Sequence, residues 1–251
     1  TTGYEEAASQ GLMAGINAHL KIHDKAPFVL KRNEAYIGVL IDDLITKGTE
    51  DPYRMFTSRA EYRTLLRQDN ADLRLTPLSY DLGLAKKERM DAVEHKASKT
   101  QELVNFFNKQ SYVPEEVNPI LEQKASALVK QSDKLTKILS RPRLTRDDLA
   151  KIPSVKAFIK EHAISDEVYE QAEIQIKYSG YIEKEMAHAE KLNRLDHIKI
   201  PDDFDYQILA SLSHEAKEKL NHIKPSNLSQ ASRISGVNPS DISVLLVKLG
   251  R

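Results

Sequence analysis

The chain of 251 residues contains no cysteine and no tryptophan, and it has only 9 glycines. The absence of cysteine excludes disulfides, thiolate metal sites and thiol nucleophiles, and it fits a cytoplasmic location. Lysine and arginine together number 37, and aspartate and glutamate together also number 37, so no net charge attracts a polyanion. Any binding of nucleic acid must therefore come from a local cluster of charge.

The sequence also lacks long apolar runs. None approaches the roughly 20 residues that a membrane-spanning helix needs, and no signal peptide is apparent. A hydrophobic content of 40% is enough to bury a core, and the length suggests one or two domains. Because the chain begins with Thr1 rather than methionine, we expect it to be a piece of a longer protein.

Apolar residues recur every three or four positions between the prolines, which predicts a mainly all-α fold of many helices. The main helices are expected at residues 4–21, 37–46, 86–109 and 166–196, with three or four short ones after residue 201. Thr145 is expected to cap a further short helix. Gly180 interrupts the longest helix at a cost of about 1 kcal/mol relative to alanine, which predicts a close approach by another helix or a ligand.

Five arginines lie between Tyr53 and Pro77. Arg59, Arg63 and Arg67 are four residues apart, so a helix capped by Ser58 and ended by a turn at residues 69–72 would place them in one ladder. No acid lies three or four positions from any of them, and each like-charge step destabilises an isolated helix by roughly 0.2–0.5 kcal/mol. Either acids elsewhere in the fold or an anionic ligand must balance this positive charge.

The sequence is compatible both with an anionic ligand and with acids of the fold as the source of the negative charge. Tyr62 and Phe56 add aromatic rings to the arginines, a mixture that suits phosphates and unstacked bases of a nucleic acid. Arginine is equally favoured in buried ion pairs, and the candidate acids are Asp42, Asp43, Asp69 and Asp72.

The remaining motifs are weaker. Residues 228–246 have the spacing of a helix-turn-helix, but the second helix offers no Lys or Arg until Lys248, which favours a packing or protein-docking role over DNA reading. The pair His19 and His23 is interpreted as a solvated helix end, and no metal site is expected. The helix start at residues 1–8 is interpreted by itself as an ordinary capped helix, although its exposed amides could hold a phosphate or a flavin.

Four segments of the chain have amino-acid sequences that resemble one family; they are residues 1–8, 52–76, 173–182 and 230–236. The resemblance covers essentially the whole chain. That family is MnmG, also called GidA, a flavin-dependent tRNA uridine 5-carboxymethylaminomethyl modification enzyme, and the chain resembles its C-terminal part. The resemblance implies an enzyme that binds FAD and uses NADH and methylenetetrahydrofolate. It also implies a homodimer that works with the GTPase MnmE on the wobble uridine of tRNA.

In this family the catalytic and main flavin-binding parts lie upstream, so the resemblance implies no catalytic residue in this chain. It implies a flavin contact by Thr1, Thr2 and Gly3. The residues that it places at the tRNA are Arg54, Arg59, Arg63, Arg67 and Arg74, with Lys177 and Tyr181 as weaker candidates. The residues that it places at the partner GTPase are Arg233, Val237, Ile242 and Leu245.

The expected organisation is the end of a flavin domain at residues 1–25, a helical tRNA-binding domain at 26–200 and a small partner-docking subdomain at 201–251. Glu183, Lys184 and Glu185 depart from the family, in which many relatives carry Arg-Gln, so a basic contribution from this turn is in doubt. A helix-turn-helix DNA-binding regulator and a structural dimerisation domain remain the alternatives.

Overall fold

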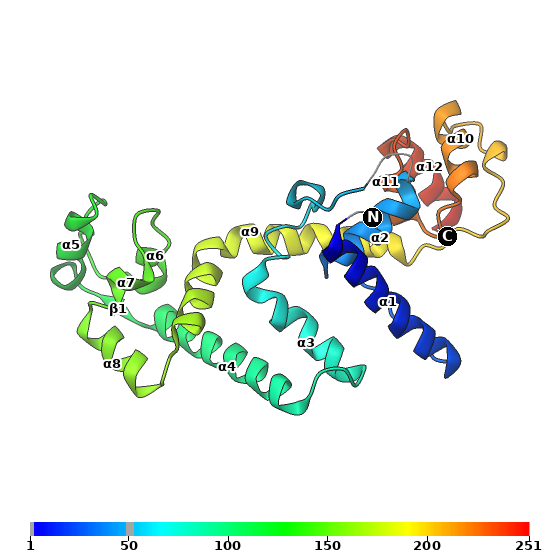
Figure 1. The fold of residues 1–251 in the computed structure, drawn as a ribbon. Coiled ribbons are helices and arrows are strands. Elements are labelled where there is room, and N and C mark those ends of the chain that lie inside the picture. Colours follow the sequence, from blue (N-terminus) through cyan, green and yellow to red (C-terminus); the bar gives the residue numbers. More distant parts are fainter. Residues whose placement is uncertain (1–2, 49–52, 251) are drawn as a thin grey trace. The chain divides into compact units, whose positions relative to one another are not determined.

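The computed structural model describes residues 3–48 and 53–250, and the chain is mainly helical (Figure 1), which confirms the predicted all-α class. The four long predicted helices are present as α1 (Tyr4–Ile22), α2 (Tyr36–Lys47), α4 (Lys87–Lys109) and α9 (Asp166–Asp196). None of the described helices combines the length and the apolar character that crossing a bilayer requires.

The chain forms two compact units. The first combines the residues up to 66 with those from 184 onward, and the second contains residues 67–183. The division expected from the sequence follows the order of the chain, whereas these units join segments that are distant in sequence. The three-part division stays a prediction.

The second unit is built from one long helix, short helices and two short strands. In chain order it contains η2 (Gln68–Asn70), α3 (Ala71–Asp81), α4, β1 (Ser111–Tyr112), α5 (Pro114–Gln123), β2 (Asp133–Lys134), α6 (Leu135–Leu139), α7 (Arg146–Leu149), α8 (Pro153–Glu161) and the first part of α9. The strands pair antiparallel. Pro114 and Pro153 begin their helices, where a missing N–H costs nothing. Thr145 and Asp148 form a capping box at α7, as expected for Thr145.

The core of the second unit lies between α4 and the helices that follow it. Leu103 and Phe107 of α4 are fully buried against apolar residues of α5, α6, α8 and α9. Lys96 is also buried, and its Nζ lies 3.0 Å from Asp72 Oδ2 and 2.6 Å from Glu167 Oε1. Burial alone would lower the pKa of Lys96, but these two carboxylates outweigh it and raise the pKa. One charged side chain thus joins α3, α4 and α9.

The first unit contains α1, α2, η1 (Thr57–Arg59), the last part of α9, η3 (Tyr206–Ile208), α10 (His214–Ile223), α11 (Leu228–Arg233) and α12 (Pro239–Leu249). The backbone before α2 passes so close to this helix that a Cβ at Gly38 would lie 2.3 Å from the carbonyl oxygen of Lys31. Only glycine fits there. Helix α2 ends at Gly48, whose φ of +83° is a conformation that glycine adopts without strain.

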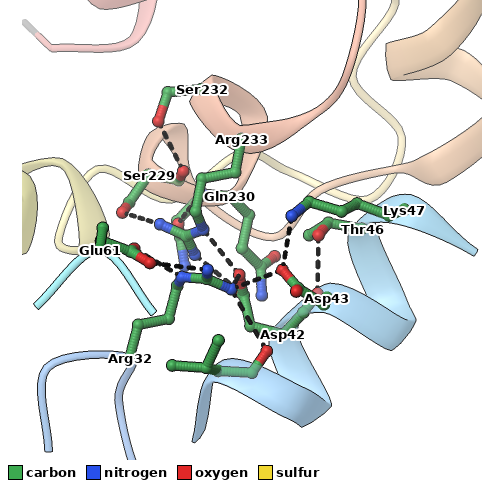
Figure 2. A network of polar contacts seen from close by, with 12 residues as sticks. Arg32, Asp42, Asp43, Thr46, Lys47, Glu61, Ser229, Gln230, Ser232 and Arg233 are labelled. Atoms are coloured by element: carbon green, nitrogen blue, oxygen red, sulfur yellow. Dashed lines mark hydrogen bonds and ion pairs between the residues drawn. The ribbon is translucent and has the colours of Figure 1, made fainter. Parts of the chain in front are cut away.

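A buried network of ions joins three segments of the first unit (Figure 2). Arg32 Nη1 lies 2.7 Å from Asp43 Oδ1 and 3.0 Å from Asp42 Oδ2, and Arg32 Nε lies 2.7 Å from Glu61 Oε1. On the other side of Asp42, Arg233 of α11 donates from Nε and Nη2 to both carboxylate oxygens at 2.7 Å. The network therefore connects α2, α11 and the segment around Glu61.

The charges of this network stabilise one another in spite of their burial. Burial would raise the pKa of Asp43, but hydrogen bonds from Lys47, Tyr53 and Arg32 outweigh it and hold the pKa below its usual value. The same guanidinium lowers the pKa of Glu61 against the effect of burial. The carboxylates of Asp43 and Glu61 are therefore ionised in the folded protein at neutral pH.

We expect Leu103→Ala to lower the free energy of unfolding by about 2–5 kcal/mol, because it leaves a cavity in a close-packed core. Urea unfolding followed by circular dichroism measures the change. The control is Leu84→Ala, whose side chain is exposed. Equal losses for the two variants would contradict the placement of Leu103.

We expect Asp42→Ala to lower the free energy of unfolding by about 3 kcal/mol, because two arginines with little exposure lose a carboxylate. Thermal and urea unfolding measure the effect. The matched control is Asp91→Ala, which removes an acid that lies 2.7 Å from Lys87 on the exposed face of α4. A solvent-exposed pair contributes less than about 1 kcal/mol. A similar small loss for Asp42→Ala would show that the buried network contributes little to stability.

Candidate nucleic-acid interface

The arginine run does not form the predicted helix. Residues 57–59 make a single 3-10 turn, Ala60 is extended, and η2 and α3 follow from Gln68, so the predicted cap at Ser58 and the turn at residues 69–72 are wrong. The predicted ladder of Arg59, Arg63 and Arg67 does not exist.

Tertiary contacts explain this difference. Ala60 and Tyr62 are both buried, although a helix would point them to different sides. The carbonyl oxygen of Arg59 accepts a hydrogen bond from Arg32 Nη2 at 3.4 Å instead of bonding within a helix. Glu61 is held by the same guanidinium. The buried network therefore decides the path of this segment over its helical periodicity.

The arginines of the run differ in what they contact. Arg54 is exposed, and its Nε lies 3.4 Å from Glu6 Oε1. The guanidinium of Arg59 lies 4.4 Å from the centroid of the Tyr53 ring, and its buried Nε has no hydrogen-bond partner among the described residues. Arg63 is exposed and makes no hydrogen bond or ion pair with any residue that the structure describes.

The last two arginines of the run belong to the second unit and are engaged. Arg67 Nε lies 3.1 Å from Asp69 Oδ1. Arg74 lies on α3, where it donates to Asn70 Oδ1 at 2.9 Å and to the carbonyl oxygen of Arg67 at 3.1 Å. These two arginines are anchored within their own unit.

Most of the four acids considered as partners of the arginine run form ion pairs with cations outside the run. Asp42 and Asp43 pair with Arg32, Asp42 also pairs with Arg233, and Asp72 pairs with Lys96. Asp69 pairs with Arg67 of the run. The charges of Arg59 and Arg63 therefore have no carboxylate partner among the residues described.

The two aromatic residues beside the arginines have opposite surroundings. Phe56 is 58% exposed, so its ring is accessible for stacking, whereas Tyr62 is only 3% exposed. Burial raises the pKa of Tyr62 to about 12, and its ring lies against His188 of α9. Of the two rings, Phe56 is the one that a base can reach.

The weaker candidates lie on α9 in the second unit. Lys177 Nζ lies 2.9 Å from Glu173 Oε1 and donates to the carbonyl oxygen of Leu144. Tyr181 is 67% exposed. A Cβ at Gly180 would meet no atom within 4 Å, so no other helix of the described chain approaches closely there, and the approach of a ligand stays a prediction.

The candidate partner-binding residues lie in the C-terminal helices, where most of them serve the fold. Arg233 is bound to Asp42, Val237 and Leu245 are buried in the core of these helices, and Ile242 packs against that core. The helices α11 and α12 have the helix-turn-helix spacing, but the Asp241 carboxylate accepts from the backbone N–H of Asn238 and of Ser213. The exposed apolar residues of α12 are Leu246 and Val247.

The candidate flavin contact lies at the start of α1. Thr1 and Thr2 lie outside the described residues, and Gly3 is the N-cap of the helix. The Glu6 carboxylate folds back over Gly3 and accepts from the backbone N–H of Met55 at 2.9 Å. Its other oxygen, Oε2, is buried without a hydrogen-bond partner among the described residues. The start of α1 therefore holds an unsatisfied side-chain acceptor, Glu6 Oε2, and no described side chain caps the helix.

Sequence reasoning missed the importance of Arg32 and Glu6. A signal for Arg32 existed, because Asp42 and Asp43 are adjacent acids within the otherwise apolar helix α2 and need a buried partner. Beside the network lies a cleft of about 520 Å³, whose lining includes Arg32, Asp42 and Tyr62. No pattern in the sequence indicated this cleft.

Three family models match the chain. Residues 188–251 match the tRNA modifying enzyme MnmG/GidA C-terminal helical bundle, residues 87–186 match the MnmG/GidA C-terminal helical domain, and residues 1–26 match glucose inhibited division protein A. Together these matches cover both ends and the middle of the chain.

Individual relatives agree with the family models. The tRNA uridine 5-carboxymethylaminomethyl modification enzymes MnmG of Christiangramia forsetii and Flavobacterium johnsoniae are 62% and 63% identical over all of this chain and 40% of their own length. The form II crystal structure of Aquifex aeolicus GidA is 42% identical with a TM-score of 0.80, over 100% of this chain and 39% of that one. The chain thus spans about two-fifths of the length of these relatives. We conclude that it belongs to the MnmG/GidA family and corresponds to the C-terminal helical part of that family.

Proposed function

We propose that this chain is the tRNA-holding and partner-docking part of an FAD-dependent enzyme. With the GTPase MnmE, that enzyme would add a carboxymethylaminomethyl or aminomethyl group to C5 of the tRNA wobble uridine. NADH and methylenetetrahydrofolate would be its co-substrates, and it would work as a homodimer in the cytoplasm. The chemical step would belong to residues outside this chain.

The observation that supports the proposal most strongly is that the positive charges of Arg59 and Arg63 are not balanced by any carboxylate that the structure describes. Neither has a carboxylate partner among the described residues, although every other arginine of the run has a polar partner. An exposed guanidinium binds a phosphate through two parallel hydrogen bonds. The Tyr53 ring holds the Arg59 guanidinium in place, which reduces the entropy lost on binding.

The neighbouring Phe56 adds a second kind of contact. Its ring is 58% exposed and belongs to the residue just before η1, which contains Arg59. Exposed aromatic rings beside cations stack on unpaired bases, and this is the way single-stranded loops of RNA are bound. Because the chain has no net charge, local groups of cations such as this one must supply the attraction to RNA.

The residues at the start of α1 fit a flavin better through its hydrogen-bond donors than through its phosphates. Glu6 Oε2 is buried and lacks a donor among the described residues, and a negative phosphate beside it would be repelled. A ring N–H or a ribityl hydroxyl of FAD is a suitable donor. Thr1, Thr2 and Gly3 would flank this contact, and the bound flavin would supply the redox chemistry.

The DNA-reading alternative has less support. Asn238 and Asp241, which would begin a recognition helix, are used in the capping box of α12. The side chains that α12 exposes include Leu246 and Val247, which suit a protein partner better than a phosphate backbone. We therefore propose that MnmE docks on this exposed face of α12, while Arg233, Val237 and Leu245 support it from within the fold.

We expect Arg63→Ala to weaken tRNA binding by the full-length protein and to reduce the slope of log affinity against log salt by about 0.7–0.9, because one phosphate contact is lost. Fluorescence anisotropy at several salt concentrations measures both quantities. Arg63→Lys keeps the charge and should keep the slope. Arg89→Ala, which removes an exposed arginine of α4, serves as a second control. If affinity and slope are unchanged in Arg63→Ala, this arginine does not contact tRNA.

We expect Val247→Glu to abolish capture of MnmE by the full-length protein without loss of folding, because the change places a charge on an exposed apolar face. A pull-down and a thermal melt measure the two properties. Leu84→Glu, at a comparably exposed position of the second unit, should leave capture intact. Retained capture by Val247→Glu would remove this face of α12 from the interface.

A further inference from the structure

A strongly basic segment of the second unit has no role in the function proposed above. Between residues 125 and 143 the chain carries five lysines and arginines but only one acid, Asp133, although the whole chain is neutral. We call these five residues the cationic rim; they are Lys130, Lys134, Lys137, Arg141 and Arg143. Such a local excess exerts a field that the net charge conceals.

Hydrogen bonds to main-chain carbonyls fix part of the rim. Lys134, on strand β2, donates from Nζ to the carbonyl oxygen of Lys109 at 2.8 Å. Arg143 Nη1 donates to the carbonyl oxygen of Ala125 at 3.0 Å, and Arg141 Nη1 donates to that of Ala127. The two arginine bonds tie the loop before β2 to the segment after α6, and the lysine bond ties β2 to the end of α4.

The kind of acceptor decides how much charge remains. A carbonyl group orients a cation but does not neutralise its charge. The carboxylates that pair with Arg32 and Lys96 do both. Among the residues that the structure describes, Lys137 is the one member of the rim with a carboxylate partner, Asp133 Oδ2 at 2.9 Å. Its hydrogen bond holds the pKa of Asp133 below the usual value. Lys130 is exposed and makes no hydrogen bond or ion pair with a described residue.

The position of these charges favours a large anionic partner. Lys130, Lys134, Lys137 and Arg143 are exposed, so an approaching anion does not have to uncover them. Cations that are already oriented lose less conformational entropy when they bind. Gln131, Ser132 and Ser140 are exposed among them and offer neutral hydrogen-bonding groups of the kind that contact ribose hydroxyls.

We propose that the cationic rim is a second tRNA contact, which holds the sugar–phosphate backbone by charge and without reading sequence. This inference rests on the proposed function, since tRNA is the partner. It adds a surface on the second unit to the cluster of Arg59, Arg63 and Phe56 on the first. Contacts of this kind position an RNA and do not select its bases.

The test uses the full-length protein and unmodified tRNA, with affinity titrated against salt. We expect the triple variant Lys130→Gln, Lys134→Gln, Arg143→Gln to reduce the slope of log affinity against log salt by about 2, because three phosphate contacts are lost. Lys130→Glu alone repeats the test at a side chain without contacts among the described residues, where folding is not at risk. The control is Lys87→Gln, an exposed lysine 2.7 Å from Asp91.

The outcomes separate this inference from the proposed function. A reduced slope in the rim variants, with an unchanged slope in Lys87→Gln, supports the rim as a tRNA contact. If the rim variants bind like the wild type while Arg63→Ala loses affinity, the rim inference is overturned and the proposed function stands. If neither set changes tRNA binding, or if the rim variants lose only the binding of an acidic protein partner, the tRNA role of the rim is overturned.

Discussion

The buried guanidinium of Arg32 is the interaction on which the first unit depends (Figure 2). It contacts the carboxylates of Asp42, Asp43 and Glu61, and Asp42 in turn holds Arg233. A buried cation is tolerated only with such complete pairing, since the loss of one partner leaves an uncompensated charge. The network therefore fixes α2, α11 and the segment of Glu61 to one another.

This constraint also shapes the candidate interface. With Glu61 and the carbonyl oxygen of Arg59 held by Arg32, the segment between Tyr53 and Leu66 cannot close into a helix. Arg63 is left exposed as a result, and the acids that could have neutralised it are engaged within the fold. The free charge of the interface is thus a consequence of charges that are paired elsewhere.

The same distinction runs through the whole chain. Cations that hold the structure together, such as Arg32, Lys96 and Arg233, contact carboxylates and have little exposure. Most cations whose proposed partner is RNA contact an aromatic ring, a main-chain carbonyl or no described residue at all, and the exception is Lys137, which contacts Asp133. The structural cations and the proposed RNA-binding cations thus differ in the group that each one contacts, more than in their place in a sequence motif. An equal number of positive and negative residues therefore does not mean an evenly neutral surface.

Much of the helical architecture could be predicted because its causes are local. The bounds of α1, α2, α4 and α9 follow from apolar periodicity, and the cap at Thr145 follows from the residues around it. The burial of Lys96 in α4 could not be predicted in this way, because it depends on Asp72 and Glu167, which lie far away in the sequence. The arginine run was predicted wrongly for the same reason.

By itself the sequence determined the helices, the all-α class and the resemblance to the MnmG/GidA family, since periodicity and motif wording are properties of neighbouring residues. Only the tertiary structure decided which arginines are paired and which are free. That decision depends on contacts such as the one between Arg233 and Asp42, which lie 191 positions apart. No local sequence pattern predicts such a pairing, because the energy of a buried ion pair depends on which charged groups the fold places within a few ångströms of each other.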